Sequence, residues 1–191
     1  MYLLVNKKEF RDLKTCINKM VSLTLSERQI CDLELLLNGG FYPLKGFFNE
    51  EDYHSVLDTM RLKTGKIWPI PINLDISEKL SEMISIGDEI ALRDKEGFAL
   101  AILKVESKWA VDKDLEAQSV FGTNDLMHPG VNFLQNNINQ IYLGGAVKGL
   151  LLPKHYDYQS LRMTPEEVKT KFHNLGWENI VAFQTRNPMH R

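Results

Sequence analysis

The sequence predicts an α+β fold in which a mostly antiparallel sheet or barrel, with helices around it, is followed by the first elements of an α/β segment. Three observations support this prediction. Short apolar and β-branched runs lie close together in the middle of the chain, helical periodicity precedes them, and a well-capped helix followed by an apolar run comes last. Closely spaced strands favour hairpins, whereas a helix that leads into a strand is typical of α/β units.

Length and composition indicate a folded, soluble protein. The 191 residues are 43% hydrophobic, and 23 Lys and Arg against 25 Asp and Glu give a net charge of -2. No broad positive field therefore favours nucleic-acid binding, and any anion site must be local. Two cysteines in no metal-binding pattern point to a reducing cytoplasm, and without about 18 consecutive apolar residues we expect no membrane span.

Three helices are expected in the first part of the chain. Over residues 7–20, apolar residues recur at helical spacing with charges between them, which predicts an amphipathic helix that covers a sheet. Ser26 and Gln29 form a capping box for a second helix, which the Gly39-Gly40 pair ends. Asn49 is the expected start of the third.

The middle of the chain is predicted to be β-rich. Pro69 and Pro71 restrict residues 67–72 to an edge strand or an irregular extended segment. A turn at residues 94–97 joins two apolar runs into a hairpin over 89–105, and residues 141–147 form a further strand.

The end of the chain changes character. Thr164 and Glu167 form a capping box around Pro165, and an apolar stripe continues to Gly176, so this is the best-defined helix. The apolar run that follows predicts a strand over 179–184. We therefore expect a first domain at 1–157 and the opening segment of a second at 158–191.

The residues that follow this strand favour oxyanion binding. Two guanidinium groups offer forked positive charge to a tetrahedral anion, neutral amide and hydroxyl groups add further hydrogen bonds, and Pro188 stiffens the loop. At the carboxyl end of a strand such a loop is a typical ligand site. The sequence of this loop is Gln184-Thr185-Arg186-Asn187-Pro188-Met189-His190-Arg191.

This loop resembles the signature Gln-x-Arg-Asn-Pro-x-His-Arg of the ATP sulfurylase (sulfate adenylyltransferase) family. Residues 28–48, 60–76 and 143–162, which include Gly144-Gly145, also resemble that family's amino-terminal region. Tyr42 departs from the usual Ser, and the family's second histidine, three positions beyond His190, is absent. We therefore expect an amino-terminal fragment that is inactive alone.

The resemblance implies a PUA-like β-barrel followed by the start of a Rossmann-like nucleotidyltransferase domain. It implies the reaction of ATP with sulfate to give adenosine 5′-phosphosulfate and pyrophosphate, with Mg²⁺ on the nucleotide, no protein-held metal, and a homo-oligomeric full-length enzyme. Gln184 and Arg186 would bind sulfate; Gln184, Asn187 and His190 would bind ATP; and Thr185, Arg186 and His190 would be catalytic. Catalysis would rest on positioning and electrostatics.

Two other functions stay open at this point. A PUA-like domain can be a noncatalytic RNA-binding module, although the net charge argues against nucleic acid. A structural or dimerising module is the other alternative. Neither of these two alternative functions would require Arg186, whereas the enzyme would.

Overall fold

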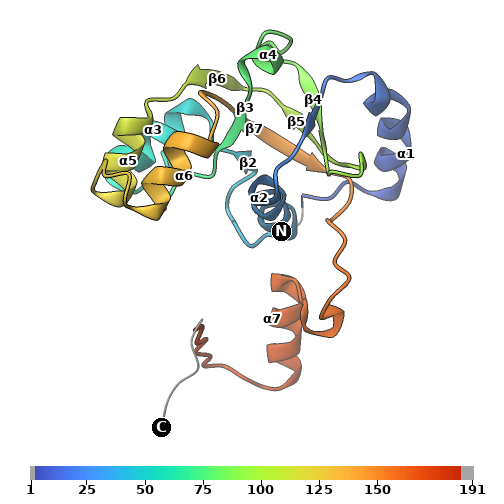
Figure 1. Ribbon diagram of the computed structural model, residues 1–191. Coiled ribbons are helices and arrows are strands. Elements are labelled where there is room, and N and C mark those ends of the chain that lie inside the picture. Colours follow the sequence, from blue (N-terminus) through green and yellow to red (C-terminus); the bar gives the residue numbers. More distant parts are fainter. Residues whose placement is uncertain (1–2, 186–191) are drawn as a thin grey trace. The chain divides into compact units, whose positions relative to one another are not determined.

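The computed structural model describes residues 3–185, and the chain forms two compact units, Met1–Lys154 and His155–Arg191 (Figure 1). We call them unit 1 and unit 2 and describe each by itself. The assignment of these units to the predicted domains, 1–157 and 158–191, stays a prediction.

Helices and strands alternate irregularly along the described part of unit 1. The helices are α1 (Lys7–Cys16), continued by a short 3₁₀ turn (Ile17–Lys19), α2 (Glu27–Asn38), α3 (Glu50–Thr59), α4 (Glu78–Ser81), α5 (Lys113–Phe121) and α6 (Pro129–Asn137). The strands are β1 (Ser22–Thr24), β2 (Gly46–Phe47), β3 (Leu74–Ile76), β4 (Glu89–Arg93), β5 (Ala99–Lys104), β6 (Ser107–Ala110) and β7 (Ile141–Gly149). Within residues 3–185, every helix is too short or too polar to cross a bilayer.

The sheet of unit 1 is organised around β7. This strand pairs antiparallel with β3 and β6 through its first half and with β2 and β5 through its second half. The strand order is β1-β4-β5-β7-β2, with β4 and β5 forming the expected hairpin and β1 adding to β4 in parallel. Because the partners of β7 change along its length, the sheet curls, as Figure 1 shows. The α+β class and the hairpin over 89–105 are confirmed.

Two glycines in β7 make this change of partners possible. A Cβ on Gly144 would lie 2.0 Å from the carbonyl oxygen of Phe48, and one on Gly145 would lie 1.9 Å from that of Lys104. Both distances are far below any real Cβ contact, and the atoms met are backbone atoms that cannot rotate away. The backbones therefore approach each other closely only because β7 has no side chains at these positions.

Helices cover both faces of the β4–β5 hairpin. On one face, Leu33 and Leu37 of α2 join the main core. On the other, Ile17 at the end of the first helical segment packs with Ala91 and Ile102. The first helix therefore covers a sheet as predicted, although its regular α-helix ends at Cys16 instead of reaching Met20.

The helix ends follow the local signals in the sequence. Ser26 and Gln29 form both hydrogen bonds of a capping box, and α2 ends at Gly39 with φ of 85°. The side chain of Asn49 accepts the backbone N–H of Asp52 at 2.8 Å and caps α3. These three predictions are confirmed, because each depends on groups that are close together in the chain.

The proline-containing segment 67–72 is irregular, with a single β-bridge between Arg61 and Ile67. Its Trp68 packs edge-on against Phe41, with ring centroids 5.8 Å apart, and also meets Phe48 at 6.3 Å. Trp68 is thus a packed aromatic residue that helps anchor this segment to the core.

Unit 2 contains a 3₁₀ turn (Gln159–Leu161) and α7 (Pro165–Asn174), whose Thr164–Glu167 capping box is confirmed. The strand predicted over 179–184 is wrong, because residues 177–185 have no regular secondary structure. A strand needs a hydrogen-bonded neighbour, and the described part of unit 2 contains no other strand to supply one.

Candidate functional site

The predicted oxyanion loop lies only partly within the described residues. Gln184 and Thr185 are included, and both are exposed. Arg186, Asn187 and His190, on which the predicted sulfate and ATP contacts also depend, lie outside the described residues. The geometry of the predicted oxyanion site therefore stays a prediction.

The segment that leads to this loop is positioned by the end of α7. Trp177 donates its backbone N–H to the carbonyl of Phe172 at 3.0 Å, and the two rings stack with centroids 5.8 Å apart. Beyond this contact the chain exposes Ile180, Val181 and Phe183, with Val181 96% exposed. The apolar residues that suggested a strand are therefore present but not buried within the described part of unit 2.

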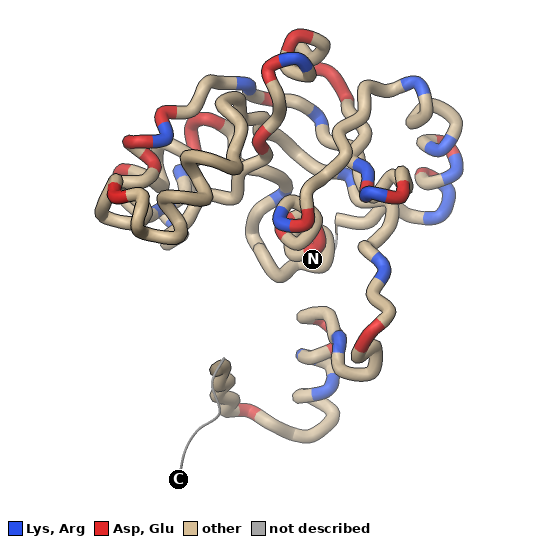
Figure 2. Tube along the Cα trace, in the orientation of Figure 1, with Lys and Arg blue, Asp and Glu red and all other residues tan. Residues whose placement is uncertain are grey.

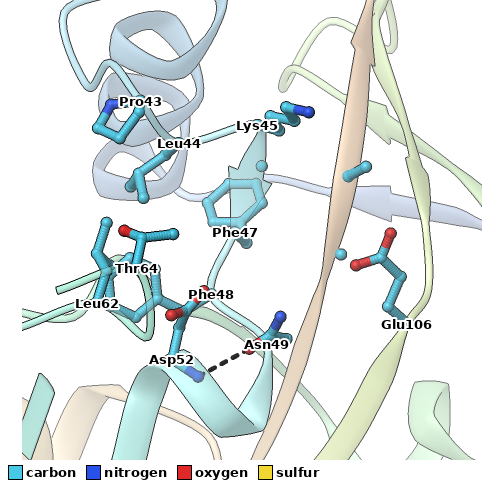
Figure 3. Close-up of a pocket in the computed structure, with 13 residues that line it drawn as sticks. Pro43, Leu44, Lys45, Phe47, Phe48, Asn49, Asp52, Leu62, Thr64 and Glu106 are labelled. Atoms are coloured by element: carbon cyan, nitrogen blue, oxygen red, sulfur yellow. Dashed lines mark hydrogen bonds between the residues drawn. The ribbon is translucent and has the colours of Figure 1, made fainter. Parts of the chain in front are cut away.

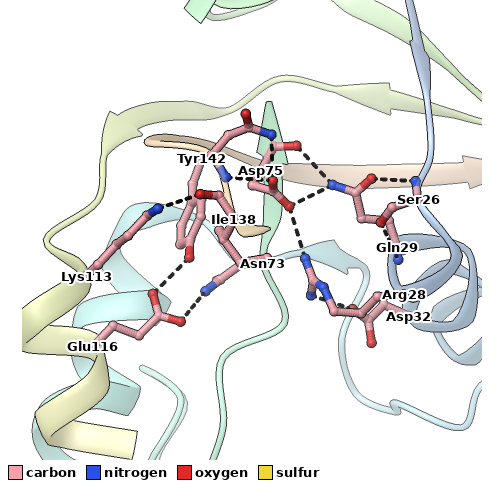
Figure 4. Close-up of polar contacts among 11 residues, drawn as sticks. Ser26, Arg28, Gln29, Asp32, Asn73, Asp75, Lys113, Glu116, Ile138 and Tyr142 are labelled. Carbon is pink, nitrogen blue, oxygen red and sulfur yellow. Dashed lines mark hydrogen bonds and ion pairs between the residues drawn. The ribbon is translucent and has the colours of Figure 1, made fainter. Parts of the chain in front are cut away.

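Unit 1 contains a polar network centred on Asp75, which Figure 4 shows. One carboxylate oxygen accepts hydrogen bonds from Arg28 Nη2 at 3.0 Å and from Gln29 Nε2 at 2.8 Å. The other accepts the backbone N–H of Asn139 at 2.9 Å and its side-chain amide at 2.8 Å. Since both oxygens accept two bonds, this buried carboxylate is fully satisfied and joins β3 to α2 and to the connection before β7.

Arg28 is held between two carboxylates. Its Nη1 donates to Asp32 at 3.0 Å while Nη2 contacts Asp75 at the same distance. Burial raises the pKa of Asp32, and the charge of Arg28 opposes this effect. With two anions already paired to it, this guanidinium is a structural cation and carries no free charge for a phosphate or sulfate group.

A second buried carboxyl, Glu116 on α5, lies between two tyrosines. Its Oε2 accepts the hydroxyl groups of Tyr53 and Tyr142, each at 3.0 Å, and Asn73 approaches Oε1 at 3.5 Å. Burial raises the pKa of Glu116 although these hydroxyl groups oppose the shift. Burial, followed by the charge of Glu116, also raises the pKa of both tyrosines.

This second cluster links α3, α5 and β7. Both tyrosine hydroxyl groups donate to the same carboxyl oxygen, Oε2, and the amide of Asn73 is near the other. It is therefore better suited to holding three elements together than to transferring a proton to a ligand. Sequence reasoning missed both networks, because Asp75 and Glu116 belong to no local motif.

A hollow of about 420 Å³ lies beside the bend of β7 (Figure 3). Its apolar wall includes Leu44, Phe47 and Leu62, and Lys45 and Glu106 lie at its margin. No described residue of the predicted sulfate site lines it. Within residues 3–185 there is also no group of three His, Cys, Asp or Glu arranged to hold a metal ion.

Comparison with known families assigns the fold. The model of the PUA-like domain family matches residues 1–151, so the chain belongs to that family. The ATP-sulfurylase family model matches residues 159–191, which include the whole predicted oxyanion loop.

Individual relatives agree with this result. The chain is 51% identical over 181 residues to the sulfate adenylyltransferase of Candida albicans, covering 89% of this chain and 34% of the relative. It is 49% identical over 172 residues to that of Mycosarcoma maydis, covering 88% and 30%. The chain thus spans about a third of the length of these curated relatives.

A solved structure is similar as well. It is described as a hexameric APS kinase from Thiobacillus denitrificans, and the match has a TM-score of 0.79 at 32% identity. The match covers 100% of this chain and 33% of the other.

Proposed function

We propose that this chain is the part of a sulfate adenylyltransferase that carries the sulfate-binding loop. One observation supports this most strongly: the two relatives described above, both with that name, match 88% or more of the chain at 49% identity or better. The match of residues 159–191 to the ATP-sulfurylase family supports it further, because that segment contains Gln184 and Arg186.

In the proposed reaction an oxygen of sulfate attacks the α-phosphorus of ATP. The bond from this phosphorus to the bridging oxygen breaks, and its electron pair leaves with pyrophosphate, giving adenosine 5′-phosphosulfate. Sulfate is already ionised at neutral pH, so no base has to remove a proton. Arg186 and Gln184 would hold sulfate, and Thr185 would hydrogen-bond the phosphoryl oxygens as their charge changes.

Asn187 and His190 would orient the phosphates of ATP, with Gln184 reaching both substrates. Mg²⁺ would enter with the nucleotide, since phosphate oxygens are the ligands that this ion prefers. The amide of Gln184 and the hydroxyl of Thr185 are neutral hydrogen-bonding groups. Such groups are better suited to contacting phosphate and sulfate oxygens than to holding a cation.

The finer fold assignment belongs to the same proposal. The curled sheet of unit 1 would be a PUA-like barrel, and α7 with the loop that follows would open a Rossmann-like nucleotidyltransferase domain. The whole enzyme would be a cytoplasmic homo-oligomer.

A chimera tests the activity. In the Candida albicans relative, this chain replaces the segment that it matches, and sulfate-dependent formation of adenosine 5′-phosphosulfate is measured. We expect activity in the chimera and none above background in the 191-residue chain alone. Arg186→Ala in the chimera should lower kcat/KM by roughly 10²- to 10³-fold, the usual effect of removing one oxyanion donor.

Arg162→Ala is the matched control, because this arginine also belongs to unit 2 but is exposed and paired with Asp157. It should leave kcat/KM within about twofold, the expectation for a surface change. A folded chimera that makes no product, or equal rates for the Arg186 and Arg162 variants, would overturn the proposal. Salt-dependent RNA binding by the intact chain would instead support a noncatalytic module.

A further inference from the structure

The two buried carboxyl groups of unit 1 have very different surroundings. Asp75 is 5% exposed and accepts four hydrogen bonds, one of them from the guanidinium group of Arg28. Glu116 is 9% exposed and accepts two hydrogen bonds of ordinary length, both at Oε2. A buried carboxylate keeps its charge only when a cation or a full set of donors replaces the lost water. The surroundings of Asp75 therefore suit an anion, whereas those of Glu116 do not.

The cations nearest to Glu116 are bound elsewhere. The ammonium group of Lys113, on the same helix, donates to two backbone carbonyls at the end of α6, and Arg28 is paired with two other carboxylates. Helix α6, which packs against α5, contains no Asp, Glu, Lys or Arg, as Figure 2 shows. The hydroxyl groups of Tyr53 from α3 and Tyr142 from β7 complete this side of the carboxyl. In the described part of the chain, Glu116 therefore has no ion-pair partner.

The amide group of Asn73, the residue before β3, faces the other carboxyl oxygen (Figure 4). Its Nδ2 lies 3.5 Å from Oε1 of Glu116, which is too long for a strong hydrogen bond. Its Oδ1 has no donor among the described residues, although Asn73 is only 5% exposed. The two ends of an amide have nearly the same shape, so a half-turn exchanges them in the same space. This turn would bring Oδ1 next to Oε1 and would cost Oδ1 no hydrogen bond.

We infer that Glu116 is a neutral carboxylic acid at neutral pH and donates its proton from Oε1 to Oδ1 of Asn73. Since Oε2 keeps both tyrosine hydroxyl groups as donors, this one proton removes a buried charge and gives Oδ1 a hydrogen bond. Burial raises the pKa of Glu116, as this arrangement requires, although the tyrosine hydroxyl groups and the charges of Arg28 and Lys113 lower it. When the proton leaves, a buried anion without a cation remains, so the attachment of α5 to β7 weakens as the pH rises.

Infrared difference spectroscopy of the 191-residue chain tests the protonation state. At neutral pH, the spectrum of the parent chain minus that of Glu116→Gln should contain the C=O band of a protonated carboxyl group and no carboxylate band. Asn73→Ala should move this C=O band to higher wavenumber, because the carboxyl hydroxyl group loses its acceptor. A difference spectrum that contains only carboxylate bands, or a C=O band that Asn73→Ala leaves in place, would overturn the inference.

Urea unfolding compares the same change, from acid to amide, at the two buried carboxyl groups. The amide introduced by Glu116→Gln can accept both tyrosine hydroxyl groups and donate to Asn73, as the protonated acid does. This variant should therefore unfold at the same urea concentration as the parent chain at about pH 4, and at a higher one at about pH 7. Asp75→Asn, the matched control, should unfold at a lower urea concentration than the parent chain at about pH 7. A Glu116→Gln variant that is less stable than the parent chain at about pH 7 would contradict the inference. None of these measurements depends on adenylyl transfer, so such a result would leave the proposed reaction untouched.

Discussion

Replacing Gly144 by alanine should strongly destabilise unit 1. The added Cβ would lie 2.0 Å from the carbonyl oxygen of Phe48 and 2.5 Å from the Cα of Asn49, where ordinary contacts begin at 3.4 Å. Because both atoms belong to the backbone, no side chain can rotate to make room. The segment that contains Phe48 and Asn49 must therefore move away from β7.

The loss in free energy of unfolding caused by this movement can be estimated from the hydrogen bonds beside Gly144. The backbone N–H of Phe48 donates to Ile72 at 3.0 Å, and that of Glu106 donates to Gly144 at 2.8 Å. Overpacking costs about 1–3 kcal/mol, and weakening these bonds adds about 1 kcal/mol each. We expect a loss of about 3–5 kcal/mol, a large share of the stability of a typical domain.

Urea unfolding followed by circular dichroism measures this loss. The matched control is Gly40→Ala, whose Cβ would meet the side-chain ends of Leu35 at 2.8 Å and Asn38 at 3.1 Å. Since side-chain ends can shift, this control should cost less than about 1 kcal/mol. If Gly144→Ala were no more destabilising than Gly40→Ala, the account of β7 as a strand that requires glycine at this crossing would be refuted.

Three further predictions concern the polar groups of unit 1. Burial raises the pKa of Glu116 above 4.5, so the folded chain binds a proton at this carboxyl more tightly than the unfolded chain does. The protonated carboxyl therefore stabilises the fold below about pH 4.5, and this stabilisation is lost as the pH rises through the folded-state pKa. Glu116→Gln should therefore flatten the decline in the free energy of unfolding above pH 4.5, and an unchanged pH profile would contradict this. Asp75→Asn should lower the free energy of unfolding, measured in urea, by about 2–3 kcal/mol, because one of the carboxylate oxygens that accept hydrogen bonds is replaced by an NH₂ group. As a control, Asp58→Asn at an exposed position should change the free energy of unfolding by no more than about 0.5 kcal/mol. Ser26→Ala should lower stability by about 1 kcal/mol and Ser26→Gly by only a few tenths, as measured by thermal unfolding.

Much of the fold could be predicted because its signals are local. The capping boxes at Ser26 and Thr164 and the cap at Asn49 join groups three positions apart, so the residues that define each helix end are visible side by side in the sequence. The β4–β5 hairpin is similar, since its strands are joined by a short turn. Local chemistry is sufficient where the interacting groups are neighbours in the chain.

The polar networks could not be predicted in this way. The partners of Asp75 come from residues 46 and 64 positions away, and those of Glu116 from residues 63 and 26 positions away. No periodicity or spacing marks such pairs, because only the folded chain brings them together. The same holds for β1, a three-residue strand that adds in parallel to β4 across a separation of about 70 positions.

The end of the described chain shows why one prediction was confirmed while its neighbour was wrong. Helix α7 forms because its backbone hydrogen bonds are internal and its Thr164–Glu167 capping box completes them. The apolar pattern of residues 179–184 is equally clear, but a strand draws its hydrogen bonds and most of its burial from neighbouring strands. Pattern alone is therefore enough to predict a capped helix but not a strand. Ile180 and Val181 are exposed because the described part of unit 2 contains no neighbouring strand to pair with this segment and cover them.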